Sequence, residues 1–497
     1  MKYISTRDKS VEVSAAQAIA QGISRESGLF VPRSLPIVDR TRLEKLVGMS
    51  YVDRACDILG GFLTDFTAEE VRECVQAAYG TGGFADEKVA PVKRIADGEY
   101  LLELWHGPTC AFKDMALQLL PHLLTRSVNK TMGGKEAAIL VATSGDTGKA
   151  ALDGFRDVPG TRIIVFYPAG GVSKIQYLQM ATQEGANVEV YGVHGNFDDT
   201  QTGVKKIFTD PAFSERMEAK NMLFSSANSI NWGRLAPQIV YYFSAYCDMV
   251  ADGEIEMGDA INVCVPTGNF GNILAAYYAK GMGLPIRKFI CASNINKVLT
   301  DFIGTGVYDR RRDFVLTSSP SMDILISSNL ERLLFALLGD DDKAVADLMN
   351  RLSTDGVYEI PAEVLSKLQA EFYGGYCDEA GTAGAIKETW EKQGYLADTH
   401  TAVALSVYRQ YRRETGDDTK TVIASTASPY KFAGSILEAL TGEREEDEFA
   451  QLDKLSALTS TQIPAQIAEL AGKQVRFAET CERDEMPGVV GKALGIR

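Results

Sequence analysis

Lys113 is a residue whose surroundings favour covalent chemistry. It lies near the end of the stretch Trp-His-Gly-Pro-Thr-Cys-Ala-Phe-Lys-Asp (residues 105–114), directly before an apolar run over residues 115–124 that predicts a helix. A lysine between Phe112 and such a run is expected to be partly desolvated, which lowers the pKa of its amine and favours imine formation. The alternative is a surface lysine whose stem lies along apolar side chains, which is the commoner situation for any single lysine.

A glycine-containing turn, Gly-Asn-Phe-Gly-Asn over residues 268–272, follows an apolar strand predicted at 260–266 and precedes a helix predicted at 273–281. Glycines let successive backbone N–H groups converge, and the start of the helix adds partial positive charge, so this turn suits a phosphate group. The alternative is a tight strand-to-helix turn whose two glycines serve only the backbone conformation.

A second turn of this type is Ser-Gly-Asp-Thr-Gly over residues 144–148. It is not a P-loop, because Thr143 stands where that motif requires glycine and Ala150 where it requires Ser or Thr. Its hydroxyls and free amides could hold a carboxylate, although a capped helix start explains them equally well. A phosphate turn, an anion turn and a desolvated lysine together point to pyridoxal phosphate, a cofactor that needs both an imine partner and a phosphate cradle.

Other chemistries and partners lack their sequence signals. The chain contains no HExxH and no GxSxG, and its four histidines have no metal-ligand spacing, so we expect no metal site. Its eight cysteines form no CxxC pair, which favours reduced thiols and a cytoplasmic location. The 51 basic and 66 acidic residues give a net charge of −15, which argues against a nucleic-acid binder. No apolar run reaches the roughly 18 residues of a membrane span, and the N-terminal residues lack the apolar centre of a signal peptide.

The hydrophobic pattern divides the chain into segments that would position these residues. Residues 1–95 predict an N-terminal extension that is mostly helical, with helices at 14–23 and 67–79. Residues 137–224 predict a small βαβ domain. Its expected strands lie at 137–142, 162–167 and 187–193, and its expected helices at 149–155 and 173–184.

The remaining strands predict a larger domain built from residues 96–136 and 225–440. Its expected strands, at 260–266, 286–292 and 420–424, come from distant parts of the chain and favour a parallel sheet. An acidic stretch at 442–448 marks a boundary, so residues 441–497 are expected to form a C-terminal tail. The predicted fold class is therefore α/β, with parallel sheets in a large and a small domain.

Beyond these patterns, the sequence strongly resembles the threonine synthase family. The resemblance is carried nearly end to end by short matching segments: Tyr3-Ile-Ser-Thr-Arg7, Gly28-Leu-Phe-Val-Pro32, residues 106–114, Ala142-Thr-Ser-Gly-Asp-Thr-Gly148, Ser229-Ile-Asn-Trp232, residues 266–272, Pro320-Ser-Met-Asp-Ile324 and Ser425-Thr-Ala427. It implies a fold-type-II pyridoxal-phosphate enzyme, related in fold to the tryptophan synthase β subunit. The N-terminal extension is similar to that of the longer bacterial and fungal branch.

The resemblance also implies roles for the residues that match. Lys113 would hold the cofactor as an imine and act as the main acid and base, and Phe112 beside it would also contact the cofactor. Thr426 would bond the ring nitrogen through its neutral hydroxyl, which leaves that nitrogen mostly unprotonated and favours elimination over transamination. The residues implied to hold the cofactor phosphate are Gly268, Asn269, Phe270, Gly271 and Asn272.

The reaction implied by the resemblance converts O-phospho-L-homoserine and water to L-threonine and phosphate. The residues expected to contact the substrate are Ser144, Gly145, Asp146, Thr147, Asn231, Arg234 and Lys431, the last two as cations for its phosphate. An ionised Asp146 would repel an anionic substrate, so it must donate a proton, accept from an amide or point away. Ser428 departs from the histidine of many relatives, which affects the wall beside Lys431.

Two other functions remain open at this point. A serine or threonine dehydratase would need no second phosphate site, although the Ser5-Thr6-Arg7 block matches the synthase pattern. A protein that binds the cofactor but has lost synthase activity would keep the same motifs. The expected partner is the small-molecule substrate, with no nucleic acid and no membrane, and the chain is expected to be a monomer or a homodimer.

Overall fold

The computed structural model describes residues 1–143 and 145–496. The N-terminal segment combines a short antiparallel sheet with four helices. The sheet has the order β2-β1-β3, with strands β1 (Tyr3–Ser5), β2 (Glu12–Val13) and β3 (Phe30–Pro32). The helices are α1 (Ala15–Gln21), α2 (Arg40–Val47), α3 (Tyr51–Phe62) and α4 (Ala68–Tyr79). Strands of two or three residues are too short to show a two-residue periodicity, so the sequence predicts only the helices here.

The two helices predicted in this segment form because their first turns are capped. Ser14 accepts from the backbone N–H of Gln17 at the start of α1, and Gly22 ends that helix with a positive φ of 74°. Thr67 forms the same kind of capping box with Glu70 at the start of α4. Each cap satisfies backbone donors that the helix itself leaves without partners.

The larger sheet has six strands in the order β14-β11-β10-β15-β5-β4, and only the edge pair β4–β5 is antiparallel. The strands are β4 (Val92–Ala96), β5 (Glu99–Glu103), β10 (Ile261–Pro266), β11 (Ile286–Ser293), β14 (Phe372–Tyr376) and β15 (Thr421–Ser425). The strands predicted at 260–266, 286–292 and 420–424 are thus neighbours in one parallel sheet, as expected. Because β5, β10 and β15 are parallel, the segments that follow them meet at one edge of the sheet.

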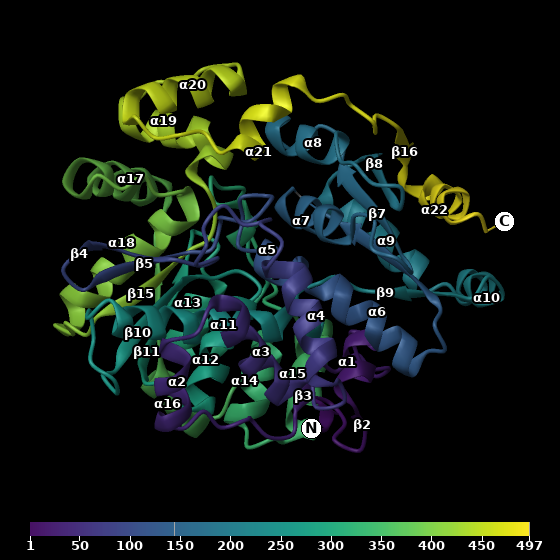
Figure 1. The fold of residues 1–497 in the computed structure, drawn as a ribbon, viewed down its shortest axis with the longest axis horizontal. Coiled ribbons are helices and arrows are strands. Elements are labelled where there is room, and N and C mark those ends of the chain that lie inside the picture. Colours follow the sequence, from purple (N-terminus) through teal and green to yellow (C-terminus); the bar gives the residue numbers. More distant parts are fainter. Residues whose placement is uncertain (144, 497) are drawn as a thin grey trace.

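Helices cover both faces of this sheet and join it to the N-terminal segment (Figure 1). Helix α18 (Thr399–Thr415) packs on β10, β11 and β15, and α12 (Gly271–Met282) packs on β10 and β11. Helix α11 (Trp232–Ala251) is buried along most of its length between α12 and the N-terminal helices α2 and α3. The other elements of this region are α13 (Val298–Thr305), β12 (Val307–Asp309), α14 (Leu330–Leu337), α15 (Asp342–Thr354), β13 (Val357–Glu359), α16 (Ala362–Glu371), α17 (Glu379–Gln393) and α19 (Ala433–Thr441).

The smaller sheet is fully parallel, with the order β16-β8-β7-β6-β9. Its strands are β6 (Glu136–Ala142), β7 (Thr161–Pro168), β8 (Val188–His194), β9 (Met222–Ser225) and β16 (Thr480–Glu482). The helices connecting them are α7 (Asp146–Phe155), α8 (Lys174–Ala181), α9 (Phe197–Phe208) and α10 (Pro211–Ala219). The strand-and-helix alternation predicted over residues 137–224 is observed within one or two residues at most element ends.

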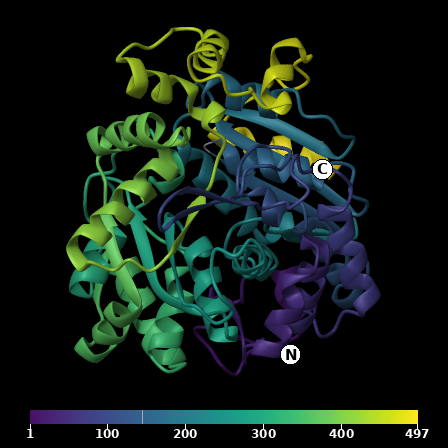
Figure 2. The ribbon, with the colours of Figure 1, turned by 60° about the vertical axis from the view of Figure 1, so that its left-hand side comes forward.

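The C-terminal segment differs from the expected tail. Its helices α20 (Glu448–Thr459) and α21 (Ala465–Ala468) are followed by the edge strand β16 and by α22 (Met486–Leu494). Figure 2 shows this yellow segment beside the blue strands of the smaller sheet. Met486 and Val490 are fully buried in the hydrophobic cluster of that sheet. Residues 480–494 therefore complete the smaller sheet, a long-range pairing that the local sequence pattern could not show.

The helix predicted at 115–124 is also interrupted. It forms as α5 (Asp114–Leu117) and α6 (Leu120–Thr131), with Pro121 in the first turn of α6, where its missing N–H costs nothing. Gly154 of α7 packs against the break, and a Cβ there would collide with the Leu117 carbonyl oxygen. Among the described residues, no helix is both long and apolar enough to cross a membrane.

We expect Met486→Ala to destabilise the protein by about 2–5 kcal/mol, because it opens a cavity between α22 and the smaller sheet. Lys492→Ala is the matched control on the same helix, since that side chain is 79% exposed, and it should change stability by less than about 0.5 kcal/mol. Denaturant unfolding followed by circular dichroism measures both. Equal midpoints for the two variants would contradict a structural role for this segment.

Candidate active site

Lys113 lies at the start of α5, in the loop that follows β5. Its side chain is only 10% exposed. Its Nζ donates to Ser321 Oγ at 2.9 Å and lies 3.8 Å from Asp146 Oδ2. Burial lowers the pKa of this amine to about 8; the Asp146 carboxylate opposes that shift, and the nearby cations Lys431 and Arg234 add to it. A buried amine with this pKa can both accept and donate a proton near neutral pH.

Asp146, in the first turn of α7, is held between two lysines. Lys431 Nζ lies 2.9 Å from Asp146 Oδ1, on the opposite carboxylate oxygen from Lys113, and Gln176 Nε2 donates to Oδ1 at 3.4 Å. Burial alone would raise the pKa of Asp146, but Lys431 and Lys113 together bring it well below its usual value. Asp146 is therefore ionised and neutralised by its neighbours. An amide contact was one of the options that the sequence left for Asp146, and Gln176 supplies it. Pairing with two cations was not among those options.

Lys431 is fully engaged in this structure. Its side chain is buried, and its Nζ also donates to the Thr109 carbonyl oxygen at 2.9 Å and to Gln179 Oε1 at 3.3 Å. These contacts join three segments: the segment after β15, the loop of residues 104–113 that ends at Lys113 (the lysine loop), and α8. The expected role of Lys431 as a phosphate ligand would require it to leave Asp146.

Hydrogen bonds from Thr109 fasten the middle of the lysine loop to Asp114 at the start of α5. Thr109 donates to the Asp114 carboxylate from its backbone N–H at 2.8 Å and from its hydroxyl at 2.6 Å. Burial raises the pKa of Asp114 to about 7, although the Thr109 hydrogen bonds oppose that shift. Gly107 must lack a side chain, because a Cβ there would lie 2.6 Å from the Asp114 Cβ.

The same loop is joined to the segment that follows β15. Phe112 donates its backbone N–H to the Thr426 carbonyl oxygen at 2.8 Å, and Ser428 donates to the Cys110 carbonyl oxygen at 3.0 Å. Phe112 also lies under the lysine, with Nζ 5.5 Å from its ring centroid. The Thr426 hydroxyl has no hydrogen-bond partner among the described residues, so it is available to a ring nitrogen.

The turn over residues 267–270 joins β10 to α12, and the carbonyl groups of Gly268 and Asn269 are already bonded. Ser327 Oγ donates to the Gly268 carbonyl oxygen at 2.7 Å, and the Asn329 N–H donates to the Asn269 carbonyl oxygen at 3.0 Å. Phe270, just before α12, has a left-handed φ of 63°. Within the described part of the chain, the backbone N–H groups of residues 268–272 have no hydrogen-bond partner.

Of the buried side-chain donors that lack partners among the described residues, one belongs to this turn and another is a cation close enough to act on Lys113. Asn272 accepts from the Tyr242 hydroxyl, but its Nδ2 is unpaired. Arg234 donates from Nη1 to the Ala227 carbonyl oxygen at 2.7 Å, whereas its Nε is unpaired, and burial lowers the pKa of its guanidinium to about 10. Buried donors without partners are costly, so these groups indicate anionic ligands. Together with Lys113, the Asn272 amide and the turn fit the imine, ring and phosphate of pyridoxal phosphate.

The other residues expected to contact the substrate lie at the starts of two helices, α11 and α7. Asn231 caps α11: its Nδ2 donates to the carbonyl oxygens of Ile19 and Ser226, and its Oδ1 accepts from Gly233. These contacts favour a structural role for Asn231. Gly145 and Thr147 lie in the turn at the start of α7, whereas Ser144 lies outside the described residues.

Gly145 has a φ of 140°, and Thr143 holds the turn by accepting from the N–H groups of Gly145 and Gly148 at 3.0 and 2.9 Å. Thr143 also donates its hydroxyl to the Gly145 carbonyl oxygen at 3.1 Å. Thr143 therefore holds Gly145 and Gly148 in place at the start of α7.

Sequence reasoning missed Ser321, which contacts Lys113, and two residues behind it. Ser321 lies within the Pro320–Ile324 segment that carries part of the family resemblance, but nothing there indicates contact with the lysine. His400 and Asp398 lie behind Ser321, where His400 Nε2 is 3.1 Å from the Ser321 backbone nitrogen and Nδ1 is 3.0 Å from Asp398 Oδ1. Within the residues the structure describes, no group of three or more acidic, His or Cys side chains is placed to hold a metal.

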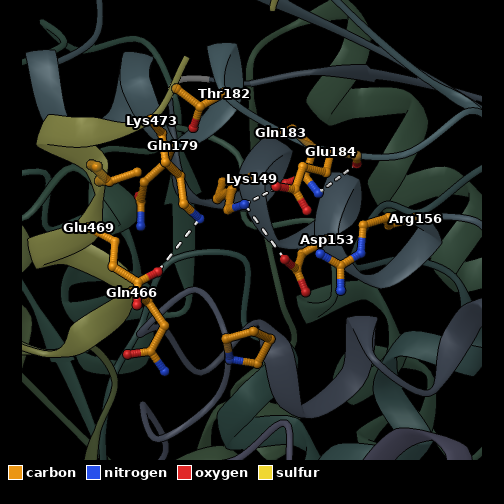
Figure 3. A pocket seen from close by; sticks show the side chains of 12 residues that line it. Lys149, Asp153, Arg156, Gln179, Thr182, Gln183, Glu184, Gln466, Glu469 and Lys473 are labelled. Atoms are coloured by element: carbon orange, nitrogen blue, oxygen red, sulfur yellow. Dashed lines mark hydrogen bonds and ion pairs between the residues drawn. The ribbon is translucent and has the colours of Figure 1, made fainter. Parts of the chain in front are cut away.

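A polar cavity of about 200 Å³ adjoins the site on the far side of Gln179. Figure 3 shows Lys149 there, pointing toward Asp153 and Gln183. Lys149 follows the 144–148 turn in sequence, but it is engaged by these partners. The side chains around the cavity come from α7, α8 and the C-terminal segment: Lys149, Asp153, Arg156, Gln179, Thr182, Gln183, Glu184, Gln466, Glu469, Leu470 and Lys473, with Pro108.

The environment of Lys113 predicts how its reactivity depends on pH. In the protein without cofactor, labelling of Lys113 by an amine reagent should rise with pH and reach half its maximum near pH 8, because the neutral amine reacts. Asp146→Asn should move that midpoint lower, since the carboxylate holds it up. Mass spectrometry of the labelled peptide measures both, with the urea-unfolded chain as the control. A midpoint equal to that of the unfolded chain would contradict the burial account.

The close packing of the phosphate turn yields a second prediction. A Cβ on Gly268 would lie well under 3.0 Å from the Ser321 carbonyl oxygen, and neither backbone can yield easily. We expect Gly268→Ala to cost about 1–3 kcal/mol and to weaken retention of pyridoxal phosphate during dialysis. Gly304→Ala, where nothing lies within 4 Å of the new Cβ, is the matched control. Cofactor retention equal to that of the control would show that the turn tolerates displacement.

Three family models match this chain. They describe the threonine synthase N terminus at residues 2–79, a pyridoxal-phosphate dependent enzyme at residues 91–427 and the threonine synthase C-terminal region at residues 401–486. The second model alone covers more than half of the chain and includes the lysine loop, the phosphate turn and Thr426.

Individual proteins agree with the family models. Human threonine synthase-like 1 is 43% identical over 88% of this chain, and this chain spans 60% of the length of that relative. The threonine synthase of Pseudomonas aeruginosa is 37% identical, covering 89% of this chain and 91% of its own length. The crystal structure of pyridoxal-phosphate-bound threonine synthase from Brucella melitensis superposes with a TM-score of 0.89 at 35% identity, covering 99% of both chains. The chain therefore belongs to the threonine synthase family, a group of fold-type-II pyridoxal-phosphate-dependent enzymes.

Proposed function

We propose that this chain converts O-phospho-L-homoserine and water to L-threonine and phosphate, the last step of threonine biosynthesis. The observation that carries the proposal is the buried amine of Lys113, with its pKa lowered to about 8, among buried donors that lack partners. Such a reaction must bind two phosphate groups, one on the cofactor and one on the substrate. Asn272 with its turn and Arg234 supply a separate set of donors for each.

Lys113 performs the proton transfers in this proposal. When bound, pyridoxal phosphate supplies an electron-withdrawing ring that stabilises negative charge at the substrate α-carbon. Lys113 Nζ removes the α-proton, releases it, and then removes a β-proton as phosphate leaves from the γ-carbon. One proton then returns to the γ-carbon and one to the α-carbon, water supplies the hydroxyl at the β-carbon, and the remaining proton of that water goes to the released phosphate. A single flexible amine with a pKa near 8 suits repeated transfers in both directions.

Arg234 is the cation best supported as a ligand of the substrate phosphate, because its Nε is buried and unpaired among the described residues. Lys431 is a second candidate, but its ammonium group already binds Asp146. The turn at residues 145–147 binds the substrate carboxylate in this proposal, together with Ser144. Because two lysines neutralise Asp146, that carboxylate does not repel an anionic substrate.

The neutral hydroxyl of Thr426 supports elimination over transamination. A hydroxyl partner leaves the ring nitrogen mostly unprotonated, which limits electron withdrawal into the ring. Thr426 is buried at the carboxyl end of β15, and its carbonyl oxygen accepts from the backbone N–H of Phe112. This hydrogen bond connects the segment that carries the Thr426 hydroxyl to the loop that carries Lys113.

Two alternatives lead to different products. A dehydratase would release a keto acid from serine or threonine, and the second set of anion donors at Arg234 argues against it. A cofactor-binding protein without synthase activity is the other alternative, and one relative at 43% identity is named threonine synthase-like rather than threonine synthase.

The direct test supplies purified holoenzyme with O-phospho-L-homoserine, with L-serine and L-threonine in separate reactions. We expect equal amounts of phosphate and L-threonine, and Lys113→Ala should abolish both because it removes the acid and base. Keto acid from the hydroxyamino acids alone would support the dehydratase. An enzyme that binds the cofactor but turns over none of the three would support the binding protein.

Arg234→Ala should chiefly weaken substrate binding. The loss of a charged hydrogen bond to phosphate is expected to raise KM by about 10–100-fold, corresponding to roughly 1.5–3 kcal/mol, with a smaller change in kcat. Arg40→Ala is the control, since its side chain is 72% exposed and pairs with Glu44 on the surface of α2. Steady-state kinetics measures both variants. An unchanged KM in Arg234→Ala would place the phosphate site elsewhere.

A further inference from the structure

We propose that His400 and Asp398 are positioning residues that hold Ser321 in place and, through Ser321, orient the amine of Lys113 against the phosphate turn. This inference rests on the proposed function only for its kinetic consequences. It concerns residues that do not themselves touch the reacting atoms, and it is carried by a chain of hydrogen bonds that runs from a buried carboxylate to the lysine.

The first link joins Asp398 to His400. Asp398 Oδ1 accepts from the His400 backbone N–H at 2.9 Å and lies 3.0 Å from His400 Nδ1, and Thr401 donates its hydroxyl to the other carboxylate oxygen. Asp398 is fully buried, and these three donors belong to the first turn of α18, which it caps. The carboxylate is thus anchored on a long helix that packs on β10, β11 and β15.

The second link fixes the protonation of the imidazole. His400 Nε2 lies 3.1 Å from the backbone nitrogen of Ser321, which can only donate. Nε2 must therefore carry a lone pair, so the ring proton is on Nδ1 and is donated to Asp398. The edge-on ring of Phe432, with centroids 4.9 Å apart, packs against the imidazole. A neutral histidine of one tautomer thus holds one backbone amide.

The third link reaches the lysine. Ser321 Oγ lies 2.9 Å from Lys113 Nζ. A hydroxyl accepts from an ammonium group and donates to a neutral amine, so this contact persists in both protonation states of Lys113. The backbone carbonyl of Ser321 also faces Gly268 so closely that no Cβ fits there. The residue held by His400 therefore sets the position of the amine relative to the turn.

This arrangement is a costly way to pack the interior. His400 is 3% exposed, and burying a carboxylate and an imidazole costs more than burying apolar side chains of similar volume unless both are fully hydrogen-bonded. Asp398 makes no ion pair with a lysine or arginine among the described residues. What the pair supplies instead is a directional acceptor for a single backbone amide next to the catalytic lysine.

The test compares His400→Leu with His400→Gln. The glutamine amide can present an oxygen to the Ser321 N–H and an N–H to Asp398, whereas leucine can do neither. We expect kcat of His400→Leu to fall about 10–100-fold with KM changed less than about threefold, because a misplaced amine affects proton transfer more than binding. His400→Gln should recover most of kcat. His194→Leu, at the exposed end of β8, is the matched control and should match wild type.

A second readout does not depend on turnover. The apoprotein is mixed with pyridoxal phosphate, samples are reduced with borohydride at intervals, and the modified Lys113 peptide is quantified by mass spectrometry. We expect capture to be slowed about tenfold or more in His400→Leu and restored in His400→Gln. If the wild type captures cofactor normally but makes no threonine, the proposed function fails and this inference is still tested by the capture rates.

Ser321→Ala covers the case in which His400→Leu does not fold. It keeps the backbone N–H that His400 binds and removes only the hydroxyl that contacts Lys113, so capture should slow to a similar extent. Wild-type capture rates in Ser321→Ala would overturn the inference. So would a folded His400→Leu with wild-type kcat, or a His400→Gln as impaired as His400→Leu.

Discussion

The burial of the Lys113 amine beside an ionised carboxylate is the constraint on which the rest of the site depends. Burial lowers the pKa of the Lys113 amine, and Asp146 limits that shift. The amine can therefore still gain and lose a proton near neutral pH. Asp146 is ionised because Lys431 and Lys113 lie beside its two carboxylate oxygens. Two lysines from the larger sheet's region and one aspartate from α7 therefore form a single electrostatic unit across the two sheets.

The larger sheet brings the parts of this unit together. The lysine loop follows β5, the phosphate turn follows β10, and Thr426 follows β15, and these three strands are parallel neighbours in the order β10-β15-β5. Their carboxyl ends share one edge, which is where ligands bind in sheets of this kind. Helix α18 supports the same edge from one face through its contacts with β10 and β15. The site is thus assembled from segments more than 300 residues apart in sequence.

The residues proposed to do chemistry could be predicted from local sequence together with the family resemblance, whereas their supports could not. Lys113 and the turn at 268–272 stand beside apolar runs, which favour burial and places at element ends, but the pattern alone is equally compatible with a surface lysine and a plain turn. The pairing of Lys431 with Asp146 and the chain from His400 to Ser321 join residues 285 and 79 positions apart, respectively, and no local signal indicates which side chains meet. The addition of β16 to the smaller sheet was missed for the same reason, because a three-residue strand has no readable periodicity.

The most direct measurement is the identity of the lysine that carries the cofactor. Holoenzyme is reduced with borohydride, digested and mapped by mass spectrometry. Three lysines lie in or beside the site, but only Lys113 combines burial with a hydrogen bond to a serine hydroxyl, whereas Lys149 is engaged with Asp153 and Gln183 and Lys431 with Asp146. We expect a single pyridoxyl group on Lys113. Attachment to Lys149 or Lys431, with Lys113 unmodified, would show that a different amine holds the cofactor.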